Sequence, residues 1–279
     1  MKTAVNRLRT ILLGTLLAAF LALQAGAQQT AGTAPEDLGA DRPGLGVGAD
    51  VVPPGALQIE AGISLASGRD GPTTTRVFIG GSPLFRLGLV RRVEVRFDGD
   101  GFRRVSSRTG GGQRDIVQGL SDFEAGLKIG VIAEGRVRPE VAVLPSLFLP
   151  VGADGLSAGS ANPSLVLAWS KNLPRSLTAG GNFAFASIKD SQGRFLRPAQ
   201  SLVIGFPIVR RLGGYAEVYR WSSATRGASA DWTFDAGLTL PLGGNAQLDV
   251  EGGHTLHSIT PSWFCGMGVV YRVRRRPGI

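Results

Sequence analysis

Charged side chains recur at every second position in several short stretches of the sequence. In residues 93–98, valine and phenylalanine alternate with Glu94, Arg96 and Asp98. Alternate residues of an extended chain point to the same side, so these charges would share one face. The same parity predicts a single charged surface, which would line the interior, or lumen, of a closed β-sheet. Its members are Glu60, Glu94, Arg96, Asp98, Asp122, Glu124, Lys128, Glu217, Asp235, Asp249 and Glu251. An acidic excess in a narrow water-filled lumen would attract cations, whereas charges that pair with one another or with a plug would not.

A second candidate for chemistry is the histidine and serine group near the end of the chain. His254, His257 and Ser258 could resemble the histidine and serine pair of an outer-membrane phospholipase. Nucleophilic catalysis also needs a third group that orients the base. No such asparagine or aspartate stands nearby in the sequence, so we expect no catalytic residues and no enzyme.

Other reactive or charged residues have simpler interpretations. Cys265 is the only cysteine, which excludes an internal disulfide and a multi-cysteine metal site, and its parity directs it toward lipid. We therefore expect neither a metal nor another cofactor. Basic residues of the predicted loops could contact lipopolysaccharide phosphates or serve only solubility: Arg69, Arg103, Arg104, Arg108 and Arg114.

The elements that must position these charges are β-strands. Residues 123–131 read Phe, Ala, Leu, Ile and Val at odd positions, with Glu124, Gly126, Lys128 and Gly130 between them. Such alternation indicates a strand with one face in an apolar environment and the other in water. The pattern returns along most of the chain and predicts an all-β fold, a transmembrane antiparallel barrel of about twelve strands. The predicted strands are 57–67, 74–89, 93–102, 120–131, 138–149, 162–170, 177–188, 197–206, 212–221, 231–240, 246–254 and 263–273.

Details of this barrel can also be predicted. Pro83 and Pro145 each remove a ladder hydrogen bond, so we expect a bulge at both. Residues 103–119 should form the longest polar loop. An even strand number places both ends of the barrel, and its short turns, on the periplasmic side. The tryptophans then fall near the two rims, although the parity of Trp221 would require a local bulge to turn it outward.

The N-terminus and the composition fit an exported protein. Lys2, Arg7 and Arg9 precede an apolar run at 11–23 and a small-residue site at 25–27, which predicts a signal peptide over residues 1–27. The alternative is a retained anchor, but the run is short for one. With 41 glycines and 2 methionines among 279 residues, a helical protein is disfavoured. The formal charge of +9 includes the three basic residues of the signal, and nucleic-acid binding is not expected of an exported chain.

A polar N-terminal segment, residues 28–54, precedes the barrel at 55–273, and a basic tail follows at 274–279. This segment is either a linker or a plug inside the lumen. We hypothesise that Asp41 and Arg42 belong to a plug, in which Arg42 pairs with an acidic cluster such as Glu94, Asp122 and Glu124.

Several stretches carry a resemblance to a known family. They are Asp41-Arg42-Pro43-Gly44, VVPPGALQIEAGISLA from Val51, and the residues 84–96, 119–128, 144–152, 231–240 and 263–271. They resemble the exported barrels associated with meta-pathway phenol degradation, often called transporters. This resemblance implies an outer-membrane channel with no catalytic residues. Members of such families are inserted by the barrel-assembly machinery through a C-terminal aromatic residue, for which Tyr271 is the expected counterpart.

The sequence therefore predicts a channel in the outer membrane of a Gram-negative-type bacterium, reached by signal-directed export. Its solutes would be small, and aromatic or hydrophobic solutes fit best. Its other partners would be outer-membrane lipid and lipopolysaccharide. A non-conducting structural or lipopolysaccharide-contacting barrel is the alternative, and an outer-membrane lipid hydrolase is the third.

Overall fold

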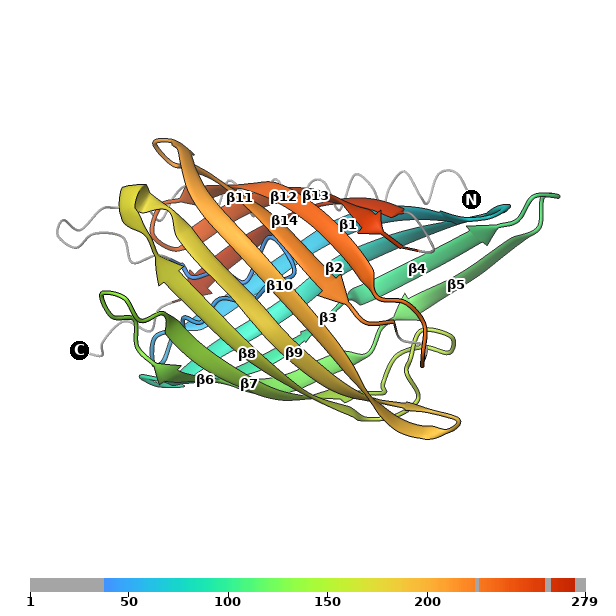
Figure 1. Ribbon diagram of the computed structural model, residues 1–279, viewed down its shortest axis with the longest axis horizontal. Coiled ribbons are helices and arrows are strands. Elements are labelled where there is room, and N and C mark those ends of the chain that lie inside the picture. The colour runs from blue at the N-terminus through green and yellow to red at the C-terminus, as the bar shows by residue number, and fades with distance from the viewer. Residues whose placement is uncertain (1–37, 224–225, 259–261, 274–279) are drawn as a thin grey trace. The chain divides into compact units, whose positions relative to one another are not determined.

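The computed structural model describes residues 38–223, 226–258 and 262–273, and these form an antiparallel β-barrel (Figure 1). The predicted signal peptide and the predicted basic tail lie outside the described residues. No helix among the described residues has the length and apolar character needed to cross a membrane. The strands are β1 (Leu57–Asp70), β2 (Thr73–Val90), β3 (Val93–Gly99), β4 (Gly101–Arg108), β5 (Arg114–Leu120), β6 (Phe123–Ile132), β7 (Glu140–Leu149), β8 (Asn162–Asn172), β9 (Thr178–Asp190), β10 (Gly193–Val209), β11 (Leu212–Trp221), β12 (Asp231–Leu242), β13 (Ala246–His257) and β14 (Ser262–Val273).

These fourteen segments make a barrel of twelve strands, as the alternation predicts. β3 and β4 both pair with the 18-residue β2 and are two parts of one strand, interrupted at Asp100. β5 and β6 are likewise two parts of the next strand, interrupted at Ser121 and Asp122. The barrel closes because β1 pairs with β14 on one side, Leu57 opposite Val273, and with β2 on the other. Closure leaves the wall without the free edge that hydrocarbon would penalise.

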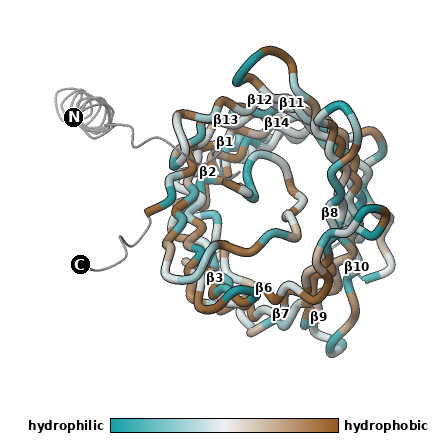
Figure 2. Tube along the Cα trace, turned by 90° about the vertical axis from the view of Figure 1, so that its left-hand side faces the viewer, coloured by the Kyte–Doolittle hydropathy of each residue, from teal (hydrophilic) through white to brown (hydrophobic). Residues whose placement is uncertain are grey.

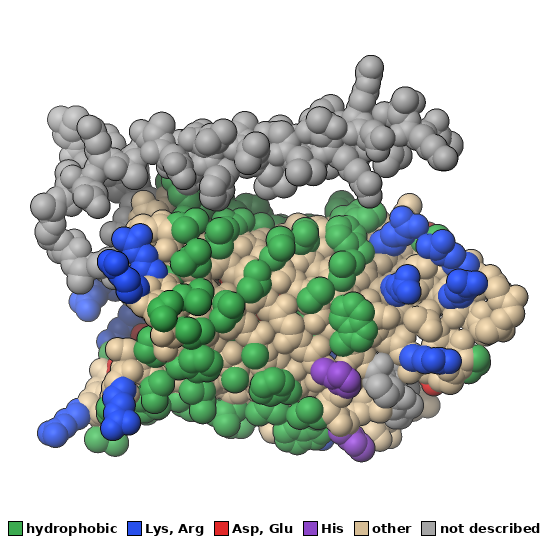
Figure 3. Space-filling view, turned by 90° about the horizontal axis from the view of Figure 1, so that it is seen from above, with side chains coloured by type: hydrophobic (Ala, Val, Ile, Leu, Met, Phe, Trp, Pro, Cys, Tyr) green, Lys and Arg blue, Asp and Glu red, His purple; other side chains and the backbone are tan. Residues whose placement is uncertain are grey.

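The two faces of the wall differ as the alternation requires. In β1, Ile63 and Leu65 are 48% and 52% exposed on the outer face, whereas the intervening side of the same strand holds Glu60 with no exposure. Hydrophobic side chains spread over the outer face, and lysine and arginine gather toward its ends (Figure 3). The apolar rows therefore point away from the barrel interior, which is the arrangement of a lipid-facing wall.

The predicted polar loop at 103–119 is wrong. β4 and β5 form a hairpin there, with Arg108 opposite Arg114, and it extends the sheet beyond the interruption at Asp100. A hairpin that leaves the apolar band can be solvated on both faces, so it needs no hydrophobic alternation. Sequence periodicity could not reveal it for that reason.

One of the two predicted bulges is present. The register of β1 and β2 shifts between Glu60 and Gly62, where Ser82 and Pro83 of β2 together stand opposite Ala61, so that β2 has one extra residue. At Pro145 the register with β6 and β8 is unchanged, so the predicted bulge is wrong. Pro145 has no backbone N–H to donate to the neighbouring strand, but no extra residue is inserted at this position.

The tryptophans near the rims lie on the face of the wall that the alternation of their strands predicts. Trp232 and Trp263 are 42% and 51% exposed on the outer face. The expected bulge at Trp221 is absent, because β11 pairs with β12 in unbroken register to its last residue. Trp221 instead keeps the interior parity of Glu217, and the guanidinium of Arg197 lies 4.9 Å from its ring centroid. A cation–π contact thus replaces the outward turn.

Candidate functional site

An N-terminal segment, residues 38–56, runs inside the ring of strands (Figure 2). Carboxylates on the wall accept hydrogen bonds from its backbone. Leu45 and Gly46 donate to Glu217 at 2.8 and 3.0 Å, and Gly44 donates to Glu251 at 2.9 Å. Val52 donates to Glu94 at 2.7 Å. The acidic residues that the sequence places in the lumen therefore hold a piece of the chain's own backbone.

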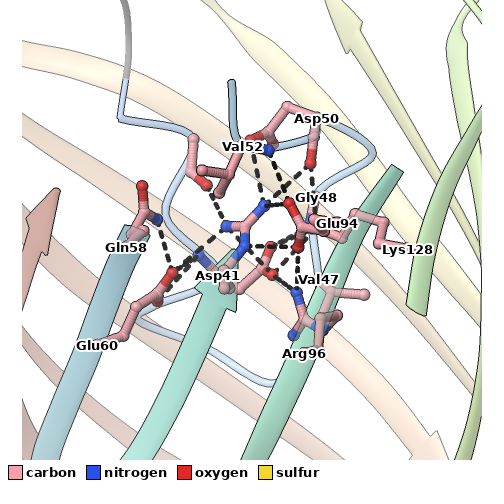
Figure 4. A network of polar contacts seen from close by, with 12 residues as sticks. Asp41, Val47, Gly48, Asp50, Val52, Gln58, Glu60, Glu94, Arg96 and Lys128 are labelled. Carbon is pink, nitrogen blue, oxygen red and sulfur yellow. Dashed lines mark hydrogen bonds and ion pairs between the residues drawn. The ribbon is translucent and has the colours of Figure 1, made fainter. Parts of the chain in front are cut away.

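Asp41 is the most connected residue of this segment. Its carboxylate lies 2.5 Å from Arg96, 3.0 Å from Lys128 and 3.3 Å from Arg86, and its backbone N–H donates to Glu60 (Figure 4). Only 7% of the residue is exposed. Burial alone would raise the pKa of Asp41, but the three cations outweigh it and hold that pKa well below its usual range. Asp41 is therefore a fixed anion that ties the segment to three wall residues.

Arg86 is the centre of the wall side of this cluster and is completely buried. It donates to Glu94 at 2.8 Å, to the Gly39 carbonyl at 2.6 Å and to the Asp50 carbonyl at 3.0 Å. Sequence reasoning missed it because Pro83 obscured the parity of this strand. The exposed Phe85, Leu87 and Leu89 nevertheless alternate with it and provide the signal that could have revealed it.

Arg42 points toward carboxylates of the inner face of the wall, and the partners predicted for it are wrong. Its guanidinium is 3.4 Å from Asp249 and 3.9 Å from Glu251, on β13, instead of meeting Glu94, Asp122 or Glu124. The neighbouring Asp41 pairs with the cations near Glu94, and Arg42 faces β13 instead. A Cβ on Gly268 would overlap the guanidinium, so this glycine leaves room for the arginine.

Further polar contacts tie the segment and line the same interior. Arg272, also missed in the sequence, donates to Gln58 at 2.8 Å and to the Leu38 carbonyl. Asp235 accepts a 2.8 Å hydrogen bond from the Tyr215 hydroxyl and is fully buried. The buried arginines make the interior less acidic than the sequence suggests.

A cavity of about 430 Å³ adjoins the segment on the side of the long loops. Its lining contains three of the predicted lumen residues that do not bind the segment: Asp98, Asp122 and Glu124. Asp122 accepts hydrogen bonds from the backbone of the β7–β8 loop, at Gly152 and Ala158. Most of the predicted lumen residues therefore either hold the segment or line open space; Arg96 does both, and Asp235 bonds to Tyr215 instead.

Among the other candidate residues, Arg103 lines the cavity, whereas the histidine, serine and cysteine candidates do not. The His254 ring bonds to the carbonyl of Thr255, next to it in the chain, and Cys265 is exposed on the outer face. Among the described residues, no group of three or more histidine, cysteine, aspartate or glutamate side chains could hold a metal ion. The basic residues Arg103 and Arg114 of the β4–β5 hairpin contact Asp100 and Ser106, and Arg69 donates to the carbonyl of Gly71.

Comparisons with known proteins agree with this architecture. A family model described as "Putative MetA-pathway of phenol degradation" matches residues 40–273. No curated protein sequence matches significantly.

Among solved structures, an outer-membrane channel from Pseudomonas putida F1 gives a TM-score of 0.58 at 13% identity, covering 81% of this chain and 98% of that chain. The transport unit of the autotransporter AIDA-I from Escherichia coli gives 0.49 at 9% identity, covering 77% and 90%. A monoaromatic hydrocarbon channel gives 0.44 at 9% identity, covering 81% and 90%. At 13% identity the likeness to the Pseudomonas putida channel concerns the fold: the barrel resembles that of a bacterial outer-membrane channel.

Proposed function

This chain belongs to the family described as a putative MetA-pathway of phenol degradation, and from that premise we propose that it is an outer-membrane channel for passive passage of small solutes. The observation that carries the proposal is the wall itself, apolar outside and charged inside, around a cavity of about 430 Å³. Charged side chains inside a lipid-facing barrel would line a water-filled path. The description of the family supports phenolic or other aromatic solutes.

The N-terminal segment acts in this proposal as a plug. Ion pairs of Asp41 and Arg42 fix it to the wall of the lumen. Its backbone also donates hydrogen bonds to Glu94, Glu217 and Glu251. A twelve-stranded barrel is intermediate in width between filled eight-stranded barrels and open sixteen-stranded pores. Passage would therefore be narrow, and opening would require the segment to move.

The lumen-lining residues would have two roles, to hold the plug and to line the path of the solute. Glu60, Glu94, Arg96, Lys128, Glu217, Asp249 and Glu251 hold the plug, and Asp98, Asp122 and Glu124 face the solute cavity. Export by a signal peptide and insertion by the barrel-assembly machinery would place the protein in the outer membrane, in contact with lipid and lipopolysaccharide.

The second candidate function is a non-conducting structural barrel, and the fastened plug is the observation that favours it. Planar-bilayer recordings in potassium chloride, together with liposome swelling in benzyl alcohol, separate the two. We expect small, regular current steps and uptake of the alcohol. A barrel that inserts correctly and passes neither ions nor alcohol, even when the plug contacts are removed, would overturn the channel.

A further inference from the structure

The cavity beside the plug holds two neighbouring carboxyl groups that have no ion pair among the described residues. Asp98 of β3 and Glu124 of β6 are direct partners across the two strands, and both line the cavity. Within the described part of the chain, the side chain of Asp98 has no hydrogen bond or ion pair, although its backbone is part of the strand ladder. Ser146 and Ser164 donate to Glu124, but both use the same oxygen, Oε1. Two neighbouring carboxylates therefore keep accepting oxygens available.

Three arginines line the cavity, and each pairs with another carboxylate; Arg42 lies 3.4 Å from Asp249. Arg96 lies 2.5 Å from Asp41 and 3.1 Å from Glu94, so its charge is shared with the plug. Arg103 lies 3.3 Å from Asp100. Among the described residues, no cationic side chain therefore forms an ion pair with Asp98 or Glu124, and a bound cation could take that place.

A third group marks the same space as a binding site. Ser121, at the interruption between β5 and β6, lines the cavity and is only 5% exposed. Its buried hydroxyl oxygen has no hydrogen-bond partner among the described residues. A buried polar atom left unpaired is costly and normally has a partner, which a bound ligand could supply.

The rest of the lining is mixed: it carries the charged residues Asp41, Arg42, Arg96, Asp100, Arg103 and Asp122 and an apolar part. Leu84, Leu144, Phe148, Leu156 and Val166 all line the cavity with the acidic pair. Its volume falls in the range of roughly 300–1,000 Å³ that is usual for pockets holding small organic molecules. An apolar wall facing two carboxylates would suit a ligand with a hydrocarbon body and a cationic head.

We propose that this cavity binds small organic ammonium ions, with the ammonium between Asp98 and Glu124 and the apolar body against Phe148 and its aliphatic neighbours. Ser121 supplies a further oxygen to the ammonium. This inference rests on the proposed function in one respect: if the barrel is a channel, a solute bound in the cavity lies on the path of passage. It makes protonated monoaromatic amines preferred over neutral phenols and aromatic acids.

Isothermal titration of the mature protein in detergent with benzylammonium, benzyl alcohol and benzoate tests the site. Benzylammonium should bind at least about tenfold more tightly than benzyl alcohol, and benzoate should not bind, because charge-assisted hydrogen bonds are stronger than neutral ones. Asp98→Asn should weaken benzylammonium about tenfold, and adding Glu124→Gln should weaken it further. Neither change should alter binding of the alcohol.

Asp70→Asn at the tip of the β1–β2 hairpin is the matched control, since it removes one carboxylate far from the cavity and should leave binding unchanged. Ser121→Ala, which removes no existing side-chain hydrogen bond, should weaken the amine about threefold and provides a second variant if Asp98→Asn fails to fold. Equal binding of amine and alcohol, or unchanged amine binding in both cavity variants, would overturn the site. Potassium chloride conductance is recorded separately, so a silent barrel that still binds benzylammonium refutes the channel but keeps the site.

Discussion

The two halves of the barrel interior use charge in opposite ways. In the half near the short turns, Asp41 contacts three cations, and Glu94 and Glu217 accept backbone hydrogen bonds from the plug. In the half near the long loops, Asp98 has no such partner among the described residues and faces a cavity. The difference teaches that an acidic residue on a lumen face is not by itself a selectivity element. Its partners decide whether it holds the chain or meets the solute.

The largest effect should follow from breaking the neutralised half. Asp41→Asn removes the anion shared by Arg86, Arg96 and Lys128 and leaves buried cations short of a partner. Removing one member of a buried pair costs about 3–5 kcal/mol. We expect a lower unfolding midpoint in urea, followed by intrinsic fluorescence, and larger single-channel currents. Unchanged currents at full insertion would show that the segment does not block the lumen.

A smaller effect should come from crowding Arg42. Gly268→Ala places a methyl group where the guanidinium lies, so the arginine must leave Asp249. Overpacking of this kind costs about 1–3 kcal/mol. Because both changes break the same contact, Gly268→Ala and Arg42→Ala should be non-additive in a double-mutant cycle of unfolding free energy. Strict additivity would mean that the two residues act independently.

A still smaller effect should mark an ion pair outside the lumen. Glu134, in the connection between β6 and β7, lies 2.6 Å from Lys171, and hydrogen bonds from Lys171 and Asn172 lower its pKa. Partly exposed pairs contribute about 0–1 kcal/mol. Glu134→Gln should therefore hardly change unfolding, and it is the control for Asp41→Asn. A loss as large as that of Asp41→Asn would remove the distinction between plug contacts and ordinary surface pairs.

The smallest effect concerns pH. The pKa of Asp41 is lower in the folded protein than in the unfolded chain, so its stabilisation is fully present above the unfolded pKa of about 4 and declines as pH falls below it. The difference in unfolding free energy between the native protein and Asp41→Asn should be constant from pH 7 to pH 5 and should shrink below pH 4. A difference that disappears between pH 7 and pH 5 would contradict the ionised, triply paired state.

Much of the fold was predictable because a lipid-facing strand needs strict alternation. Glu94, Arg96 and Lys128 were placed on the inner face from their parity alone. Pairing could not be predicted in this way, since it depends on the three-dimensional path of the plug. The predicted partners of Arg42 were therefore wrong. Arg86 was not predicted, because the bulge at Pro83 interrupts the alternation of its strand.

The measurement that tests the central claim most directly locks and releases the plug. A Cβ on Gly46 would lie 3.0 Å from the Ser201 hydroxyl and 2.7 Å from the Glu217 carboxylate, so Gly46→Cys with Ser201→Cys can be joined by a disulfide once that carboxylate shifts. The pair is built into Asp41→Asn with Cys265→Ala, and single-channel current is recorded before and after reduction. The plug predicts a low current when oxidised and a reversible increase on reduction. Equal currents in both states, with the disulfide verified, would show that residues 38–56 do not control the lumen.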